Sequence, residues 1–363
     1  MPFTIAEIAH ALGIRAEGDV NLRIHAVAEP AQAADTDLAL AMKPEFAEQL
    51  DQGTARAAML WDTADWQALG LSAALLAPRP RYAMSGLSAM MDDGARYPTG
   101  IHGTAIVDPS AVIQNNVTIG PFTVISAGAV IGQGSTLGAH VFVGDGAQIG
   151  ANALVHPGVR IGHDVRIGTN FIAHFNATVG ADGFSFVTPE PSSIENVRDT
   201  LGDRGDAAAQ SYARIHSLGG VTIGDNVELG SNTCVDRGTV RDTRIGSGCK
   251  FDNLAQVGHN VVIGTDCLIC AQVGIAGSSR IGNNVVLGGQ TGVSDNLFIG
   301  DNVITGGATK VLSNVPAGRV MLGYPAMKMD AQLDLYKQLR RLPRLIADVA
   351  ALKKSVSKTD GSH

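Results

Sequence analysis

Aromatic and charged residues are scarce in this sequence. Of its 363 residues, only 5% are aromatic and 17% are charged, whereas 44 are glycine. This composition is unusual for an ordinary globular core and favours a repeat architecture built on tight turns. Basic residues are not in excess either: the net charge is −7 and the pI is near 5.8. Binding to nucleic acid is therefore not expected.

Long apolar runs are also missing. No stretch approaches the roughly 18 apolar residues that a membrane-spanning helix needs, so we expect a chain that does not span a membrane. Residues 1–7 show no basic segment followed by an apolar core. We therefore expect no secretory signal peptide, and we expect a cytoplasmic protein.

The strongest positive signal is a six-residue period of aliphatic side chains. Almost every sixth residue is Ile, Leu or Val, with Ala173 as the exception, in the series Ile101, Val107, Ile113, Ile119, Ile125, Ile131, Leu137, Val143, Ile149, Val155, Ile161, Ile167, Ala173 and Val179. Neither the helical period of 3.6 nor the strand period of 2 produces this spacing. The period predicts a parallel β-helix, in which each hexapeptide forms one short strand and one corner of a triangular prism.

Two interruptions divide the repeat. The period stops over 182–216, a polar stretch that we interpret as an excursion loop, and it resumes at Ile223. It then shifts by four residues within 236–244 and continues from Ile245. Three hexapeptides close one coil, and successive coils are expected to stack at about 4.8 Å. We assign this β-helix domain to residues 101–316.

The repeat is flanked by two other segments. Residues 1–100 read as a small α/β domain, with Thr4 and Glu7 forming a capping box before a first helix and a further helix expected at 64–69. Residues 326–363 read as a helical C-terminal extension in which Pro343 is expected to start a second helix. The predicted fold class is therefore mainly β, with an α/β domain and a helical tail.

The four cysteines are too few for a disulfide scaffold in a chain of this length. Cys267 and Cys270 form a CxxC pair, which is compatible with metal or redox chemistry. Cys249 and Cys267, however, are separated by three hexapeptides, which make one coil of the repeat. We therefore favour small side chains stacked inside the prism, and we expect no metal site.

The aliphatic-Gly repeat resembles the hexapeptide acyltransferases. Further motifs narrow the resemblance, and they are Gly180-Ala181-Asp182-Gly183-Phe184, Asp236-Arg237-Gly238, Gly258-His259-Asn260-Val261-Val262-Ile263-Gly264, Ala276-Gly277-Ser278 and Gly288-Gly289. Together with the order of the three segments, they resemble the UDP-3-O-(3-hydroxyacyl)glucosamine N-acyltransferases of lipid A and lipopolysaccharide biosynthesis. The resemblance covers nearly the whole chain.

This resemblance implies several properties. The β-helix is expected to be left-handed, and the protein is expected to form a homotrimer with active sites between neighbouring prisms. The reaction would move a 3-hydroxyacyl group directly from acyl carrier protein to the 2-amine of a UDP-sugar. The donor would be carried on the phosphopantetheine of acyl carrier protein, and no other cofactor is implied. Residues 1–100 would bind the uridine.

His259 is the candidate catalytic base. The attacking amine must lose a proton, and an imidazole that titrates near neutrality suits this role. His259 matches the catalytic histidine of the family motif. A histidine that only decorates a turn would have the same local pattern, and His163 in Gly162-His163-Asp164 occupies the same hexapeptide position.

Gly277 is the second catalytic candidate. It lies three hexapeptides after His259, and both residues stand two places after an inward aliphatic residue. They should therefore stack about 5 Å apart on one edge of the prism. A backbone N–H at Gly277 would stabilise the oxyanion of the thioester, as the resemblance also implies. A glycine required only by the corner fits the sequence equally well.

Further substrate-binding residues follow from the resemblance. Gln256 and Asn260 match polar positions that contact substrate, although Gln256 also fits a solvated face. Asn296 stands where the family has a second histidine, and an amide there cannot change its charge. In the first domain the family's Asn-Pro-x-Tyr is replaced by Lys43-Pro44-Glu45-Phe46.

Phe46 can still stack on uracil, and Lys43 can reach a phosphate. Alternatively, Phe46 packs in the core of its own domain. In the tail, basic side chains from Lys328 to Arg344 form either a docking surface for the acidic acyl carrier protein or a solvated helix face.

Three rival interpretations remain. The related UDP-N-acetylglucosamine O-acyltransferases resemble the prism but lack a counterpart of residues 1–100. A zinc enzyme similar to the γ-class carbonic anhydrases would need His156, His163 and His174, whose spacing differs from that family. A scaffold without catalytic activity would tolerate the loss of His259.

Overall fold

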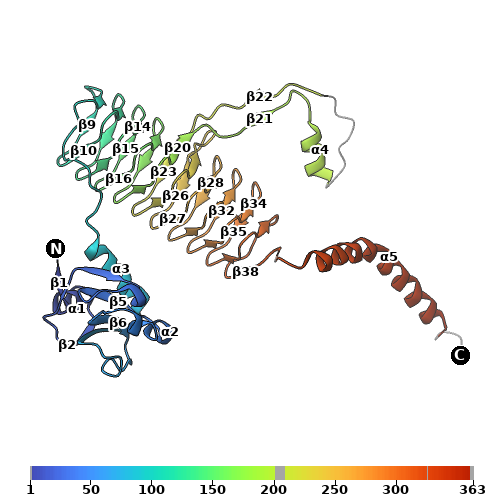
Figure 1. Ribbon diagram of the computed structural model, residues 1–363. Helices are drawn as coiled ribbons and strands as arrows, with labels where there is room; N and C mark the ends of the chain where they lie inside the picture. Colours follow the sequence, from blue (N-terminus) through green and yellow to red (C-terminus); the bar gives the residue numbers. More distant parts are fainter. Residues whose placement is uncertain (1, 201–208, 325, 360–363) are drawn as a thin grey trace. The chain divides into compact units, whose positions relative to one another are not determined.

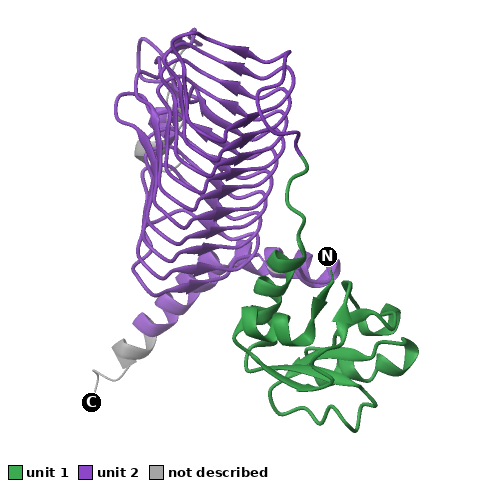
Figure 2. Ribbon diagram, turned by 90° about the vertical axis from the view of Figure 1, so that its left-hand side faces the viewer, with its two compact units in different colours: residues 1–96 green, residues 97–363 purple. Residues whose placement is uncertain are grey.

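The computed structural model describes residues 2–200, 209–324 and 326–359, and these fall into two compact units (Figure 2). Unit 1 is Met1–Arg96 and unit 2 is Tyr97–His363. The division at Arg96 lies slightly before the expected limit of 100. Residues 201–208 of the predicted excursion and 360–363 of the predicted tail lie outside the described residues.

Unit 1 is built on a mixed sheet with strand order β2-β7-β6-β5-β4. β2 (Arg15–Gly18) runs antiparallel to β7 (Ala73–Ala77), and the neighbours β6 (Ala57–Trp61), β5 (Asp37–Leu40) and β4 (Ala26–Ala28) continue in parallel. β6 and β7 are apolar almost throughout because both faces of the sheet are covered by buried side chains.

The first helix confirms the predicted capping box. α1 (Ile5–Leu12) begins after Thr4, whose backbone N–H donates to Glu7 Oε2 at 2.7 Å while Glu7 N–H donates to Thr4 Oγ1 at 3.2 Å. The helix ends at Gly13, which has φ of +63°. A left-handed residue at this position is least strained when it is glycine.

The helix expected at 64–69 was wrong. These residues form turns, because Asp65 Oδ1 accepts the N–H of Ala68 at 3.2 Å and Gly70 reverses the chain with φ of +71°. The other elements of unit 1 are β1 (Phe3–Thr4), which pairs with β3 (Arg23–Ile24), α2 (Pro44–Ala47), α3 (Pro80–Met91), and the short 3-10 helices η1 (Pro30–Gln32) and η2 (Leu50–Gln52).

In its described part, unit 2 is a parallel β-solenoid with three sheets (Figure 1). The first sheet contains β10 (Thr118–Ile119), β13 (Thr136–Leu137), β16 (Leu154–Val155), β19 (Ile172–Ala173), β24 (Glu228–Leu229), β27 (Lys250–Phe251), β30 (Leu268–Ile269), β33 (Val286–Leu287), β36 (Ile304–Thr305) and β38 (Val320–Met321). The second contains β8 (Ile106–Val107), β11 (Val124–Ile125), β14 (Phe142–Val143), β17 (Arg160–Ile161), β20 (Thr178–Ala181), β25 (Cys234–Asp236), β28 (Gln256–Val257), β31 (Gly274–Ile275), β34 (Gly292–Val293) and β37 (Lys310–Val311). The third contains β9 (Val112–Ile113), β12 (Val130–Ile131), β15 (Gln148–Ile149), β18 (Arg166–Ile167), β23 (Val221–Ile223), β26 (Thr243–Ile245), β29 (Val262–Ile263), β32 (Arg280–Ile281) and β35 (Phe298–Ile299).

The register of the strands confirms the six-residue period. Ile119 lies beside Leu137, which follows it by three hexapeptides in the next coil, and both side chains are buried. Their counterparts form one continuous apolar core along the solenoid. Cys249 and Cys267 are buried in this core on neighbouring coils, as the spacing predicted.

The excursion leaves the solenoid after β20 and returns at β23. It contains β21 (Phe186–Val187), which pairs antiparallel with β22 (Ala213–Arg214), and α4 (Ser193–Thr200). Despite this detour, Ile167 still pairs with Ile223. The coil therefore closes as if the excursion were absent, because the inward aliphatic residues on either side keep their register.

The solenoid extends beyond the expected limit of 316. β38 (Val320–Met321) pairs with β36 although this segment lacks the hexapeptide pattern. A single helix then follows, α5 (Met329–Thr359), and Pro343 lies inside it. The expected second helix was therefore wrong. An exposed helix tolerates one missing backbone bond because water can pair with the released carbonyl. None of the described helices is both long and apolar enough for a membrane span.

Candidate active site

His259 lies at a corner of the solenoid, directly after β28. Val257 points into the core and is fully buried, whereas the His259 side chain two residues later is half-buried. On one side the coil stacks on β25 and on the other side it stacks on β31. His259 is therefore held at a fixed height between the two neighbouring coils, with its side chain outside the prism.

Gly277, in the next coil, lies against the ring of His259. A methyl carbon placed on Gly277 would lie 2.7 Å from both Cε1 and Nε2 of the imidazole. Ser278 N–H donates to the carbonyl oxygen of His259 at 2.9 Å, which ties the two corners together. Within the described residues, the Gly277 N–H donates to no protein acceptor. The predicted stacking of His259 and Gly277 is present.

Gly183, from the start of the excursion, lies against the other end of the same side chain. A methyl carbon on Gly183 would lie 2.6 Å from Cβ and 3.0 Å from Cγ of His259. The Gly183 N–H donates to Ser217 Oγ at 3.0 Å, so the outgoing and returning ends of the excursion meet here. Gly183 belongs to the Gly180–Phe184 motif, but the sequence pattern alone does not predict its contact with His259.

Asn260 fixes the tautomer of His259. Its Oδ1 accepts a hydrogen bond from His259 Nδ1 at 2.9 Å and another from the Thr239 N–H at 3.1 Å, while its Nδ2 donates to the Arg241 carbonyl at 2.9 Å. The Thr239 and Arg241 contacts orient the amide, because one requires an acceptor and the other a donor. The proton of neutral His259 is therefore on Nδ1, and Nε2 carries the lone pair.

Asn260 is buried, with 7% of its surface exposed. Its backbone N–H donates to Thr243 Oγ1 at 2.9 Å, and Arg241 donates to its carbonyl at 3.0 Å. The segment 236–244, which contains the four-residue shift in the repeat, therefore folds around Asn260. The structure places this residue behind His259 with its polar groups satisfied within the chain.

Asp236 and Gln256 form a polar pair beside His259. Burial raises the pKa of the Asp236 carboxyl above its ordinary value, while a hydrogen bond from Gln256 and the nearby His259 act in the opposite direction. Gln256 is exposed at the end of this pair.

His163 has a different environment from His259, although both occupy the same hexapeptide position. The Arg237 side chain, which is 3% exposed, contacts the ring of His163 and donates from Nε to the Gly219 carbonyl at 2.7 Å. His163 is therefore part of the contact that attaches the returning excursion to the solenoid.

Asn296 lies one coil beyond Gly277, on the side away from His259. Its backbone N–H donates to the Gly277 carbonyl at 3.0 Å, and its Nδ2 donates to Asp295 Oδ2 at 3.1 Å. Two coil steps separate Asn296 from His259, a height of roughly 10 Å. The exposed amide is therefore placed along the same edge without touching the imidazole.

Lys43 and Phe46 lie in unit 1, on and just before α2. Lys43 Nζ is 3.8 Å from Glu45 Oε1, and both side chains are largely exposed. Phe46 is 40% exposed, so its ring is not part of the core of the domain. The ring is accessible for stacking, as the uridine-binding interpretation requires.

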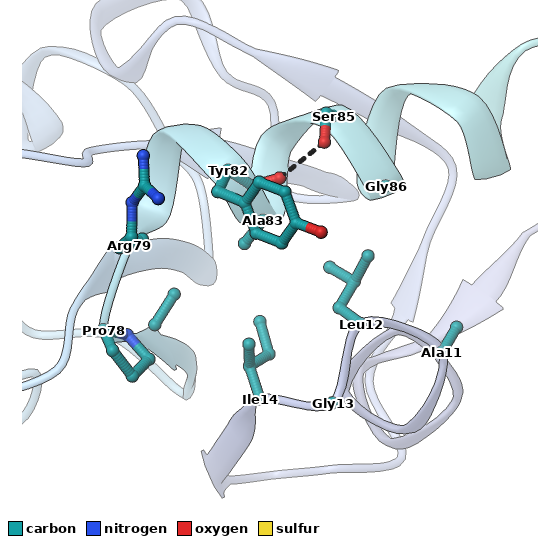
Figure 3. A pocket seen from close by; sticks show the side chains of 11 residues that line it. Ala11, Leu12, Gly13, Ile14, Pro78, Arg79, Tyr82, Ala83, Ser85 and Gly86 are labelled. Carbon is teal, nitrogen blue, oxygen red and sulfur yellow. Dashed lines mark hydrogen bonds between the residues drawn. The ribbon is translucent and has the colours of Figure 1, made fainter. Parts of the chain in front are cut away.

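Unit 1 also contains a cavity of about 380 Å³ between α1 and α3 (Figure 3). Neither Lys43 nor Phe46 lines it. Tyr82 and Leu12 face this space, and Arg79 stands at its edge in the close view. The cavity therefore does not coincide with the predicted uridine site.

The histidines of the proposed zinc site do not gather around one point. His156 and His174 stack with ring centroids 5.2 Å apart, but His174 Nε2 pairs with Glu228 Oε1 at 2.8 Å and His156 Nδ1 with the Tyr97 hydroxyl at 3.1 Å. Nowhere in the part of the chain that the structure describes do three potential ligands have a metal-binding arrangement.

Comparison with known proteins identifies the family. The bacterial transferase hexapeptide model (six repeats) matches residues 110–145, 140–170 and 242–277. An Arabidopsis UDP-N-acetylglucosamine acyltransferase structure is similar with a TM-score of 0.51 at 22% identity, covering 61% of this chain and 71% of its own. That likeness concerns the fold alone.

Two relatives match over almost their full length. A Ruegeria pomeroyi protein named UDP-3-O-acylglucosamine N-acyltransferase is 60% identical over 363 residues, with 100% of both chains covered. A Paracoccus denitrificans protein of the same name is 56% identical over 358 residues, covering 99% of this chain and 98% of its own. The chain is therefore an acyltransferase that belongs to the UDP-3-O-acylglucosamine N-acyltransferase family.

Proposed function

We propose that this chain transfers a 3-hydroxyacyl group from acyl carrier protein to the 2-amine of UDP-3-O-(3-hydroxyacyl)glucosamine, giving a UDP-2,3-diacylglucosamine for lipid A. The two full-length relatives carry the corresponding name. The observation that carries the proposal is the pairing of His259 with Gly277. Nε2 of a tautomer-fixed imidazole lies beside a glycine whose N–H is unpaired within the described residues.

The chemistry requires one base and one oxyanion donor. His259 Nε2 removes a proton from the sugar amine as the nitrogen attacks the thioester carbonyl. The carbonyl oxygen becomes negatively charged, and the Gly277 N–H donates a hydrogen bond to it. Collapse of the tetrahedral intermediate forms the amide and breaks the C–S bond, and His259 returns the proton to the departing sulfur.

Asn260 and Asp236 both act on the His259 ring, the first through a hydrogen bond and the second through its charge. The bond from His259 Nδ1 to Asn260 Oδ1 keeps the lone pair on Nε2 before the reaction. Asp236 stands near the same ring, and its charge stabilises the imidazolium that forms when the proton is taken. Gln256 would contribute by holding Asp236, and Asn296 would bind substrate along the same edge.

Direct transfer, without an acyl-enzyme intermediate, is favoured by the state of Cys234. This residue precedes Asp236 by two positions and is half-buried. Burial and the charge of Asp236 raise the pKa of the Cys234 thiol above its ordinary value. A protonated thiol is a weak nucleophile, so the sugar amine attacks the donor itself.

The acceptor would be held through its uridine by Phe46, with Lys43 reaching a phosphate. The donor would reach the site on the phosphopantetheine of acyl carrier protein, and no metal or redox cofactor takes part in the proposed steps. This donor implies a cytoplasmic location. A candidate docking surface for the acidic carrier protein is formed by Lys328, just before α5, and by Lys337, Arg340, Arg341 and Arg344 within it.

A homotrimer completes the proposal. The outer face of the first sheet carries apolar side chains that a monomer leaves in water, including Leu268, Ile304 and Val320, which are between 45% and 76% exposed. Apolar residues repeated along one surface are typical of a subunit interface. Neighbouring prisms would then form the cleft in which His259 meets its substrates.

The test uses purified protein with 3-hydroxyacyl carrier protein as the donor. We expect mass spectrometry to show one new amide on UDP-3-O-(3-hydroxyacyl)glucosamine and no product from UDP-N-acetylglucosamine. Acylation of UDP-N-acetylglucosamine instead would favour the O-acyltransferase reaction. It would also leave the presence of unit 1 unexplained.

A further inference from the structure

The two ends of the excursion meet over the side chain of His259. Gly183 packs against His259, and its N–H is bonded to Ser217. Beyond Gly183 the chain forms the β21–β22 ribbon. In this ribbon the Ile215 N–H donates to the Ser185 carbonyl at 3.0 Å. Phe184 is the residue directly after Gly183. The α-carbon of Phe184 is therefore only about 3.8 Å from that of Gly183, which packs against His259.

Phe184 is exposed although it is large and apolar. Its exposed fraction is 85%, and its ring meets that of Phe186 edge to face, with ring centroids 5.1 Å apart and an angle of 62° between the planes. Phe186 is braced from the other strand by Arg214, whose guanidinium carbon lies 4.8 Å from the ring centroid and whose NH1 is 3.9 Å from Asp182 Oδ2. The β21–β22 ribbon therefore holds Phe184 in position and leaves most of its ring uncovered.

We propose that Phe184 binds the 3-O-acyl chain of the acceptor and helps to select acceptors with a long chain. The inference rests on the proposed function. A large apolar side chain that is exposed beside a reacting group is typical of a ligand contact. The described residues around Phe184 leave most of its side chain uncovered, and Phe186 is the aromatic ring that it meets.

The position of the two glycines determines which of the two acyl chains reaches Phe184. Gly277 lies at Cε1 and Nε2 of His259, so the thioester of the donor belongs on that side, where the unpaired N–H is found. Gly183 lies at Cβ and Cγ, at the other end of the same side chain. The amine and the 3-O-ester of the acceptor are on adjacent sugar carbons. With the amine at Nε2, the ester chain leaves the sugar within a few ångströms of the base and can turn toward Gly183.

The test compares acceptors that differ only in the length of the 3-O-acyl chain, such as a 3-hydroxybutanoyl and a 3-hydroxytetradecanoyl ester. For Phe184→Ala we expect the ratio of kcat/KM for the long-chain acceptor to that for the short-chain acceptor to fall about tenfold, because an apolar contact to the chain is lost. Phe184→Leu should retain most of the preference. A purely structural role of Phe184 would not change this ratio.

Tyr212→Ala is the matched control, because Tyr212 is an aromatic residue on the same excursion, is 65% exposed and precedes β22. It should leave the ratio unchanged. Equal loss of activity with both acceptors in Phe184→Ala, or a changed number of subunits, would overturn the inference and indicate a contact to a second copy. Absence of amide formation by the unaltered protein would instead overturn the proposed function itself, and the inference with it.

Discussion

The imidazole of His259 rests on the α-carbon of Gly277. Both residues stand two places after an inward aliphatic residue, in neighbouring coils, and a side chain on Gly277 would occupy the space of Cε1 and Nε2. The glycine therefore does more than permit a corner. It leaves room for the ring beside Nε2, the nitrogen that we propose takes the proton.

Gly277→Ala should lower the rate of amide formation by roughly 100-fold or more. The added methyl would lie 2.7 Å from Nε2, so the ring must move away from the position at which base and oxyanion donor act together. The measurement is kcat with saturating acceptor and acyl carrier protein.

Gly274→Ala is the control for this substitution, because a methyl on Gly274 meets no atom within 4 Å. Gly274 lies in the same coil, at the start of β31. Comparable rates for the two alanine variants would contradict the assigned role of Gly277.

Gly183→Ala should also impair catalysis, through the excursion. A methyl at 2.6 Å from His259 Cβ cannot be accommodated unless the outgoing strand moves, and this would strain the bond from the Gly183 N–H to Ser217. We expect a lower kcat while the solenoid melts at a nearly unchanged temperature. Gly103→Ala, which has open space around it, provides the comparison. If Gly183→Ala is fully active, the excursion does not position the base.

Asp242→Asn should reduce stability in a pH-dependent way. The Gly220 N–H donates to Asp242 Oδ1 at 2.8 Å, and this bond is the main cause that holds the pKa of the carboxyl below its ordinary value. A lowered pKa stabilises the folded state above the pKa of the unfolded chain, about 3.9, and the stabilisation is lost as the pH falls through the folded value. The melting temperatures of the two proteins should therefore differ at pH 7 and converge toward pH 3. A difference that is constant with pH would show that the charge is not responsible.

Phe46→Ala should raise KM for the UDP-sugar without lowering kcat by a similar factor. The ring is 40% exposed on α2, and stacking on uracil would be worth about 1–2 kcal/mol, or about tenfold in affinity. Phe46→Tyr keeps the aromatic face and should behave as the unaltered protein does. An unchanged KM in Phe46→Ala would place the uridine elsewhere in unit 1, for example in the cavity beside Tyr82.

The sequence predicts the solenoid well because each coil repeats one local rule. Ile119 and Leu137 are neighbours simply because three hexapeptides separate them, and the same arithmetic brings His259 to Gly277. The rule fails where the chain leaves the repeat. Gly183 reaches His259 through the excursion, and no periodic relation connects the two positions.

Asn260 and Pro343 show two other limits. Asn260 looks like an exposed polar residue of a motif, but the four-residue shift at 236–244 folds over it and takes up its hydrogen bonds. Pro343 resembles a helix start, yet the described helix continues through it. For Asn260, contacts with residues elsewhere in the sequence outweigh the local pattern. For Pro343, the access of water to an exposed helix outweighs it.

The most direct test of the central claim is the turnover of His259→Ala with UDP-3-O-(3-hydroxyacyl)glucosamine and 3-hydroxyacyl carrier protein. Loss of a general base should reduce kcat by about 100- to 10,000-fold, while the circular dichroism spectrum and the number of subunits stay as in the unaltered protein. A kcat within a few-fold of the unaltered protein would contradict the assignment of His259 as the base.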